Sequence, residues 1–303
     1  MTLLAGGVGG ARFALGLVDV VGAEAVTIVG NVGDDVELLG LHVSPDLDTC
    51  LYTLAGSIDR QQGWGVAGDT REALGVIGRL GGPDWFILGD RDIGLHLVRS
   101  ERLRAGEPLS RITAEISERL GVRVHLVPAT DDRLRTRVRT DEDELEFQDW
   151  FVGRRAAPAV RGLRFEGSPG ARPAPGVLEA IALADRIVLA PSNPFISLDP
   201  ILAVDGVRAA VEARRDAVVA VTPIIAGRAV KGPLGEMLDS LGHERSAVGV
   251  ARHLASVASR FVLDRRDAER AGEVAALGLQ PVVAQTLMRD DASRLALAQA
   301  ALA

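Results

Sequence analysis

Cysteine is nearly absent from this sequence, since Cys50 is the only one in 303 residues. A single cysteine cannot form a disulfide within the chain, and it excludes a zinc site built from several cysteines. Such sparing use of cysteine is typical of proteins that work in a reducing compartment. We therefore expect a cytoplasmic protein without structural disulfides.

Long hydrophobic runs and an excess of positive charge are also missing. No uninterrupted apolar stretch reaches the roughly 18 residues of a membrane-spanning helix, and no basic segment of the secretory type precedes the first apolar residues. The 34 lysines and arginines are outnumbered by 41 aspartates and glutamates, which gives a formal net charge of −7. Because a polyanion needs a basic field on the protein surface, we expect neither a nucleic acid nor a membrane as a partner.

Apolar residues, in contrast, are abundant: 47% of the chain is hydrophobic and 25% is charged, which indicates a globular protein with a buried sheet. Short apolar runs that end in a polar or Gly/Pro loop predict strands at residues 1–5, 25–29, 85–88, 122–127, 186–190, 217–221, 260–263 and 281–284. Helical patterns occur between many of them, at residues 12–20, 70–80, 108–120, 176–184 and 207–214. This alternation predicts an α/β fold with a doubly wound, mostly parallel, Rossmann-like sheet.

One segment interrupts this alternation. An acidic turn at residues 141–144 lies between the segments 136–140 and 145–151, which predicts an inserted β-hairpin. We expect three parts: an N-terminal α/β part of the core (1–135), an inserted hairpin with a smaller lobe (136–175), and a C-terminal α/β part of the core (176–303). The alanine-rich tail from Asp291 predicts a final amphipathic helix.

Polar clusters follow the predicted strands one after another, at residues 6–12, 31–35, 89–92, 128–132, 191–194 and 222–223. In open parallel sheets, ligands bind beyond the carboxyl ends of the strands. We therefore expect these clusters to face one crevice.

The glycine-rich segment 6–12 follows the first strand and opens the first helix. Backbone N–H groups at a helix start can receive a phosphate, and Arg12 can add a bidentate contact. The segment departs from a dinucleotide fingerprint, because Arg12 stands at the third glycine position counted from Gly7 and the second strand ends at Asn31 instead of an acid. No P-loop lysine follows. A phosphate cradle and a tight turn that needs glycine remain equally supported interpretations.

Four aspartates lie close in sequence: Asp34, Asp35, Asp46 and Asp48. Carboxylate oxygens at this density suit Mg²⁺ bridging a diphosphate. Alternatively, Asp34 caps a helix, and Asp46 and Asp48 form a turn after Pro45. Crowding of like charges favours the cation. Their spacing does not resemble a calcium-binding EF-hand loop.

Two further clusters contain candidate site residues. In the segment 89–92, Asp90 can accept a proton or a hydroxyl hydrogen bond and Arg91 can meet a phosphate or carboxylate, although an ion-paired loop is an alternative. In the segment 191–194, two prolines fix Ser192 and Asn193 in a rigid turn, and no Gly-x-Ser-x-Gly context supports a nucleophilic serine. Lys231 can reach a phosphate or be an ordinary surface lysine.

Taken together, these blocks resemble the 2-phospho-L-lactate transferase family of coenzyme F420 biosynthesis, including its phosphoenolpyruvyl-transferring bacterial branch. The matching segments run through nearly the whole chain: 6–12, 31–35, 44–52, 63–65, 69–70, 88–92 with His96, 128–132, 147–150, 190–194, 222–225 and 286–288. The first two segments look more like the bacterial branch, which favours an enolpyruvyl donor over a lactyl or glyceryl one.

The resemblance implies a Mg²⁺-dependent transferase. The ribityl hydroxyl of the deazaflavin Fo would attack the phosphorus that carries a three-carbon acid in a guanylyl diphosphate donor, and GMP would leave. The donor would contact Gly7, Gly9, Gly10, Arg12, Ser192, Asn193 and Pro194. The acceptor would contact Asp48, Thr49, Gly89 and Arg91. Catalysis would fall to Asp46, Asp48, Asp90 and Arg91, and Mg²⁺ to Asp34, Asp35, Asp46 and Asp48.

The family also suggests a homodimer. The main alternative is a non-catalytic regulator that binds a nucleotide sugar or dinucleotide, because a related family shares the glycine-rich start. An NAD-dependent oxidoreductase is disfavoured by the defective fingerprint.

Overall fold

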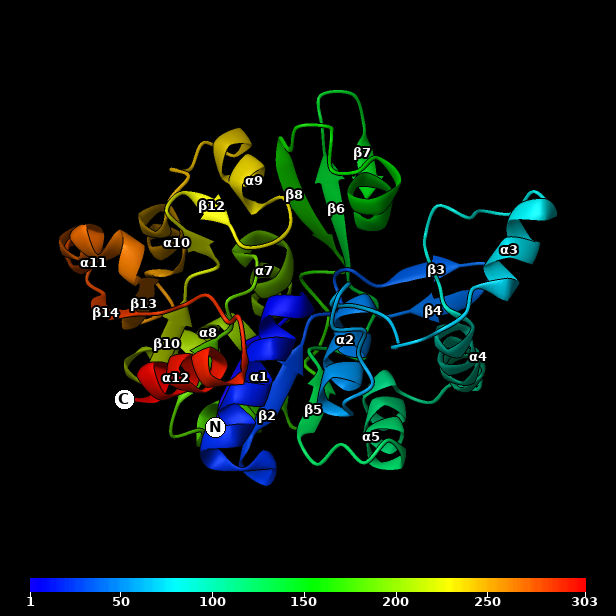
Figure 1. Ribbon diagram of the computed structural model, residues 1–303, viewed down its shortest axis with the longest axis horizontal. Coiled ribbons are helices and arrows are strands. Elements are labelled where there is room, and N and C mark those ends of the chain that lie inside the picture. The colour runs from blue at the N-terminus through cyan, green and yellow to red at the C-terminus, as the bar shows by residue number, and fades with distance from the viewer.

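A seven-stranded sheet forms the centre of the protein in a computed structural model that describes residues 1–303 (Figure 1). Every neighbouring pair of strands in this sheet is parallel. In spatial order the strands are β14 (Gln280–Ala284), β13 (Arg260–Asp264), β10 (Val218–Val221), β9 (Ile187–Leu189), β1 (Thr2–Ala5), β2 (Thr27–Gly30) and β5 (His125–Pro128).

This strand order confirms the predicted doubly wound α/β fold. The chain runs outward from β1 to β2 and β5, then returns to β9 on the other side of β1 and continues to β14. The direction of winding therefore reverses between β1 and β9. In folds of this kind the ligand crevice lies at that switch point, beyond the carboxyl ends of the strands.

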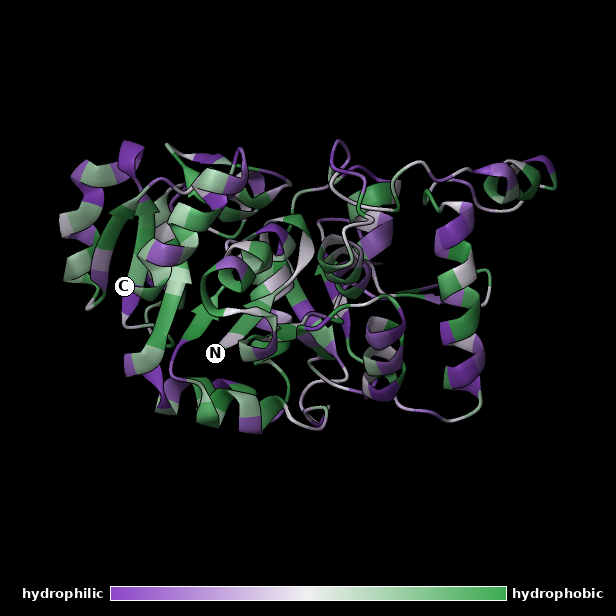
Figure 2. Cartoon of the chain, turned by 60° about the horizontal axis from the view of Figure 1, so that its bottom comes forward, coloured by the Kyte–Doolittle hydropathy of each residue, from purple (hydrophilic) through white to green (hydrophobic).

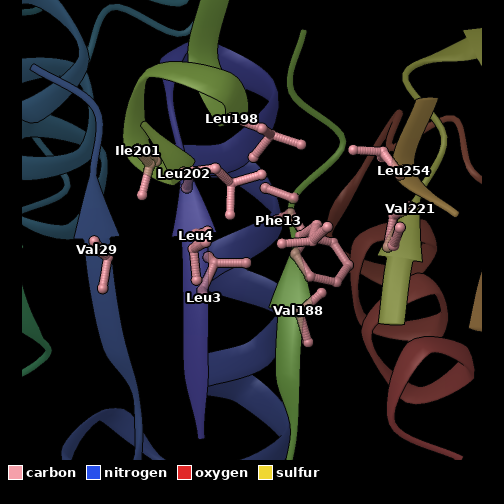
Figure 3. Close-up of a cluster of buried hydrophobic side chains, with 14 of the residues drawn as sticks. Leu3, Leu4, Phe13, Val29, Val188, Leu198, Ile201, Leu202, Val221 and Leu254 are labelled. Atoms are coloured by element: carbon pink, nitrogen blue, oxygen red, sulfur yellow. The ribbon is translucent and has the colours of Figure 1, made fainter. Parts of the chain in front are cut away.

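The core surrounds the central strands. All residues of β1, β9 and β10 are buried, as expected for parallel strands covered on both faces. Figure 3 shows Leu3 and Leu4 of β1 beside Val188 of β9, with Phe13 reaching in from the first helix. Green, hydrophobic segments predominate in the central strands, whereas the outer helices alternate between green and purple segments (Figure 2).

Helix α1 (Gly7–Val21) packs against α2 (Pro45–Leu54) and the C-terminal helix α12 (Asp291–Leu302). The predicted C-terminal helix is therefore present. The remaining helices are α3 (Glu72–Arg79), α4 (Asp90–Arg104), α5 (Leu109–Arg119), α6 (Val177–Leu183), α7 (Asp199–Leu202), α8 (Val207–Ala213), α9 (Leu234–Ser240), α10 (Ala247–Leu254) and α11 (Ala271–Ala276). No helix is both long enough and apolar enough to span a membrane.

A small antiparallel sheet lies beside the central one and contains the predicted hairpin (Figure 1). Its strands are β7 (Glu144–Glu146), β6 (Arg135–Arg139) and β8 (Gly162–Glu166). The second hairpin strand ends at Glu146, not at residue 151 as predicted, and a π-helical segment covers Asp149–Gly153. The spacing of the aromatic residues explains this difference. Phe147 and Phe151 are four residues apart, which is a helical spacing, and their rings stack at 5.4 Å between centroids.

The predicted strand at residues 85–88 is wrong. This segment bends at Trp85 and Phe86 before it leads into α4, and it pairs with no strand. Phe86 and Leu88 are buried against a separate hairpin, β3 (Val36–Leu38) with β4 (Leu41–Val43), whereas Trp85 and Ile87 are exposed. Alternating apolar residues thus pack one face of the segment without joining a sheet. Two further short strands, β11 (Ile224–Ile225) and β12 (Arg228–Ala229), form a hairpin after β10.

Candidate active site

The two glycine- and proline-rich loops meet at the switch point between β1 and β9. Helix α1 begins at Gly7, five residues earlier than predicted, so the glycines form its first turn. Ser192 follows β9, and its Oγ donates a hydrogen bond to the Gly6 carbonyl oxygen at 2.7 Å. The Asn193 side chain accepts a hydrogen bond from the Phe195 N–H at 3.0 Å and begins the π-helical segment Pro194–Leu198. The structure therefore brings the predicted donor-binding loops together.

Close packing explains two of the glycines. A methyl group on Gly9 would lie 2.5 Å from the Pro191 carbonyl oxygen, and one on Gly10 would lie 2.9 Å from Ser192 Oγ. Gly7 has a φ of +63°, which side chains rarely adopt. The first turn of α1 is thus tied to the loop after β9, with its leading N–H groups at the carboxyl edge of the sheet.

We expect Gly9→Ala to destabilise the protein by about 1–3 kcal/mol, because the added methyl group must displace backbone on two elements. Gly94→Ala in α4 is the matched control: its methyl group meets nothing within 4 Å, and it should stabilise the protein by about 0.5–1 kcal/mol. Urea unfolding of both variants measures the difference. Equal stabilities would contradict the tight contact at the switch point.

Three of the predicted aspartates lie buried close together, and one of them touches the glycine turn, residues 6–10. Asp46 at the start of α2 accepts a hydrogen bond from Asn31 Nδ2 at 2.9 Å, and the Asn31 Oδ1 in turn accepts one from the Gly33 N–H at 2.8 Å. A methyl group on Gly6 would lie 2.3 Å from Asp46 Oδ2, so this carboxylate touches the glycine turn. Asp34 and Asp35 are 6% and 4% exposed.

This crowding changes the acidity of the carboxyl groups. Burial raises the pKa of Asp46 to about 6, and the charge of Asp35 adds to the effect. Burial also raises the pKa of Asp34 well above its usual range, with a further contribution from the charge of Asp46. A cation bound beside these groups would favour their ionised forms.

A histidine that the sequence analysis missed balances Asp35. In the hairpin β3–β4, His42 stands opposite Glu37, and its ring nitrogens lie 2.8 Å from Glu37 Oε1 and 2.9 Å from Asp35 Oδ2. Burial alone would lower the pKa of His42, but these two carboxylates raise it to about 9. His42 is therefore a cation at neutral pH. Ser44 Oγ donates a second hydrogen bond to Asp35 Oδ2 at 3.0 Å.

Asp48 is paired with Arg99, a residue that sequence reasoning also missed. The Arg99 guanidinium makes a bidentate contact with both carboxylate oxygens, one of them at 3.0 Å, and both residues are buried. Although burial opposes ionisation, the Arg99 charge lowers the pKa of Asp48. His96 Nδ1 lies 3.7 Å from Asp48 Oδ2, and burial lowers the pKa of His96 to about 4. Asp92, His96 and Arg99 stand at helical spacing on α4, and this spacing was the available signal.

Two other predicted residues, Asp90 and Arg91, stabilise a different part of the structure, around the starts of α3 and α4. Asp90 accepts hydrogen bonds from Thr70 Oγ1 at 2.5 Å and from the N–H groups of Glu72 and Ala73, so it caps α3. The Arg91 N–H donates to Asp69, and its side chain donates to the Ala67 carbonyl oxygen. Neither Asp90 nor Arg91 shares a hydrogen bond with Asp46 or Asp48.

Two smaller predicted residues complete the set. Gly89 lies against Asp69, since a methyl group on it would be 2.1 Å from Asp69 Oδ2. Thr49 is buried in α2, next to Asp48. Gly89 thus belongs with the α3 and α4 junction, and Thr49 belongs with the buried acidic cluster.

Unpartnered polar atoms are concentrated in this region. Ten buried side-chain nitrogen and oxygen atoms have no hydrogen-bond partner in the protein, and five of them belong to one connected group of charged and polar residues: Asp34 Oδ1, Asp35 Oδ1, Tyr52 Oη, His96 Nδ1 and Arg99 Nε. Such atoms are few in native proteins, and water, an ion or a polar ligand can satisfy them. The cluster is therefore a candidate for contact with a polar ligand.

The four aspartates do not form one metal-binding sphere. No group of three or more His, Cys, Asp or Glu side chains is arranged to hold a metal ion alone, and both oxygens of Asp48 contact Arg99. The residues nevertheless fit a shared site, because Mg²⁺ usually takes one or two carboxylates and completes its shell with water and substrate phosphates. Asp34 and Asp35 each have one oxygen without a partner.

Comparison with known proteins places the whole chain among transferases. The family model described as 2-phospho-L-lactate transferase CofD matches residues 1–289. The chain is 41% identical to a phosphoenolpyruvate transferase of Streptomyces griseus, over 100% of this chain and 97% of the relative. It is 44% identical to a phosphoenolpyruvate transferase of Thermobifida fusca, over 89% and 87% of the two chains.

A solved structure of a Bacillus halodurans protein, a member of the UPF0052 family, is similar in fold. It superposes with a TM-score of 0.64 at 15% identity, covering 100% of this chain and 98% of that chain. At this identity the likeness concerns the fold alone.

Proposed function

This chain belongs to the 2-phospho-L-lactate transferase CofD family of coenzyme F420 biosynthesis, and on that premise we propose that it transfers an enolpyruvyl phosphate group to the deazaflavin Fo. The donor would be a guanylyl diphosphate bearing the three-carbon acid, and GMP would leave. The names of the relatives, phosphoenolpyruvate transferases, favour enolpyruvyl over lactyl. The coarser assignment, a transferase of a phosphorylated three-carbon acid, follows from family membership.

The observation that supports the proposal is the position of the buried cluster of charged side chains. It begins at Asp46 against the glycine turn and extends through Asp35 to Arg99 and Asp48. A diphosphate at the glycine turn would thus have the carboxylates on one side and the α1 N-terminus on the other. Negative carboxylates and the positive end of a helix would therefore both lie next to the phosphates, as phosphoryl transfer requires.

In the proposed reaction, the ribityl oxygen forms a bond to the phosphorus that bears the acid, the bond from that phosphorus to the GMP oxygen breaks, and the hydroxyl proton is released to water. The first turn of α1 and Ser192 orient the diphosphate, and Asp46 and Asp48 orient the attacking hydroxyl. Bound Mg²⁺, held by Asp34 and Asp35 with Asp46, would neutralise phosphate charge. Positioning and charge neutralisation account for most of the catalysis in such a step, and no covalent enzyme intermediate is needed.

Asp90 and Arg91 enter the proposal with a smaller role. Their backbone and side-chain contacts join the segment before α3 to the start of α4. We place the acceptor ring beside this junction, where Gly89 and Arg91 would border it. Thr49 would contribute through its position next to Asp48.

We expect incubation with Fo, Mg²⁺ and the enolpyruvyl donor to give the phosphodiester product and GMP, with slower turnover of lactyl and glyceryl donors. Mass spectrometry of the product and chromatography of GMP measure both. EDTA should stop the reaction and added Mg²⁺ should restore it. Binding of a nucleotide sugar or dinucleotide without product from any donor would favour the non-catalytic regulator instead.

A further inference from the structure

Lysine is used once in this chain. Of the 34 lysines and arginines, only Lys231 is a lysine. Lysine and arginine differ in a way that matters at a crowded anion site: the ammonium is a compact point charge with three donors, whereas the guanidinium is a broad planar fork. The position of this one lysine is therefore informative.

Lys231 reaches the glycine turn from the opposite half of the chain. It follows β12, and its Nζ donates a hydrogen bond to the Gln62 carbonyl oxygen at 2.6 Å. A methyl group on Gly63 would lie 3.1 Å from Lys231 Nζ and 2.9 Å from Val8 Cγ1. Gly63 thus lies between the Lys231 ammonium and Val8 in the first turn of α1, close to both.

The ammonium also has a cation beside it and no acid. Partial burial lowers the pKa of Lys231, and the charge of Arg12 lowers it further. Neither Arg12 nor Lys231 takes part in any of the ion pairs of the structure, although the protein carries an excess of acidic residues. Two neighbouring cations without a counter-ion, next to the N-terminus of a fifteen-residue helix, form a local positive field in a negative protein.

We propose that Lys231 and Arg12 together bind the phosphates of the donor, and that Lys231 exchanges the Gln62 carbonyl oxygen for a phosphate oxygen when the donor enters. This inference rests on the proposed function and adds a residue from the C-terminal half to the donor site. A phosphate oxygen carries more negative charge than a carbonyl oxygen, so the exchange gives Lys231 the stronger hydrogen bond. The compact ammonium fits beside Gly63 and Val8.

Because the lysine is single, amine acylation tests the inference directly. Lys231 and the N-terminal amine are the only two amines of the chain, and the latter donates to the Ala25 carbonyl oxygen at the opposite edge of the sheet. We expect saturating GDP with Mg²⁺, and separately inorganic pyrophosphate, to slow acylation of Lys231 about tenfold or more. Acylation of the N-terminal amine should be unchanged. Peptide mass spectrometry reads both sites in one experiment.

Substitutions at Lys231 provide a second test of the inference. Lys231→Gln should weaken GDP binding by roughly ten- to a hundredfold, the usual effect of losing one charge-assisted contact, and Lys231→Arg should recover part of it. Arg123→Gln is the control, since it removes the same charge near the amino end of β5. Calorimetry with GDP and with pyrophosphate measures the affinities, and urea unfolding checks that each variant is folded.

The outcomes separate this inference from the proposed function. If the wild-type protein binds GDP but Lys231 is acylated equally fast with and without it, or Lys231→Gln binds GDP as tightly as wild type, the role of Lys231 is refuted while the donor site stands. If the wild-type protein binds neither GDP nor pyrophosphate and yields no product, the proposed function itself fails.

Discussion

Replacing Asp46 with asparagine is expected to lower turnover by roughly a hundredfold to a thousandfold while making the unliganded protein more stable at neutral pH. The loss of rate follows from removing a preorganised charge that touches the glycine turn and orients the reacting groups. The gain in stability follows from burial, which raises the pKa of Asp46 from an ordinary value of 3.8 to about 6. Asparagine keeps the oxygen that accepts from Asn31 and has no charge to bury.

The raised pKa of Asp46 determines how the stability difference between the variant and wild type changes with pH. A carboxyl group with a raised pKa favours the folded state when protonated, so its contribution is fully present below pH 3.8 and is lost as the pH rises through about 6. At pH 7 the variant should be more stable than wild type by about 1–3 kcal/mol. Towards pH 4 the difference should disappear.

Urea unfolding at both pH values, together with product formation at saturating donor and Mg²⁺, tests the Asp46 prediction. Asp290→Asn is the control, because Asp290 caps α12 far along the chain and is not buried. A variant that is less stable than wild type at pH 7 would contradict the idea that Asp46 is held ionised at a cost to the fold. Wild-type turnover would remove Asp46 from the reaction.

The same substitution at Asp48 should have the opposite effect on stability. Asp48→Asn removes the partner of Arg99, a residue that is 2% exposed and whose guanidinium makes a bidentate contact with this carboxylate. Breaking a buried ion pair from one side typically costs about 3–5 kcal/mol, because the remaining charge stays buried and uncompensated. The lowered pKa of Asp48 leads to the same expectation. Ionised Asp48 stabilises the folded state above its ordinary pKa, and this stabilisation is lost as the pH falls through the lower pKa of the folded state.

A double-mutant cycle measures this coupling. Asp48→Asn and Arg99→Met should each destabilise the protein, and the double variant should be more stable than the sum of the two losses predicts. Circular dichroism during urea unfolding provides the free energies. Additive effects, or a loss below about 0.5 kcal/mol for Asp48→Asn, would show that the pair is not held as a buried ion pair.

The fold and the two aspartates also show which features of the structure the sequence predicts and which it does not. Apolar runs ending in polar loops predicted all seven strands of the central sheet, because continuous burial on both faces leaves a strong local pattern. The segment at residues 85–88 has the same pattern on one face only, and packing against a hairpin satisfies it without a strand partner. Periodicity reports which residues are buried, and it does not report what hydrogen-bonds to their backbone.

At the site, the sequence indicates which loops lie at the carboxyl edge of the sheet. It does not indicate which residues form hydrogen bonds or ion pairs with the side chains of those loops. Asp46 and Asp48 stand two residues apart on α2 in the same acidic motif, yet one contacts Asn31 and the other contacts Arg99. Arg99 comes from a helix fifty-one residues further along the chain, and no local motif encodes that distance. Whether a carboxylate is free or paired is a tertiary property.

The hydrogen bond between Ser192 and Gly6 joins residues 186 positions apart, and this separation bears on synthesis of the protein. While a ribosome is still translating the first half of the chain, β1 can pair with β2, but the strand that completes its other side does not yet exist. The glycine turn therefore acquires its second wall only after β9 and the loop beyond it have emerged. Nascent chains shorter than about 200 residues should not retain guanine nucleotides, because a binding site built from distant segments forms late.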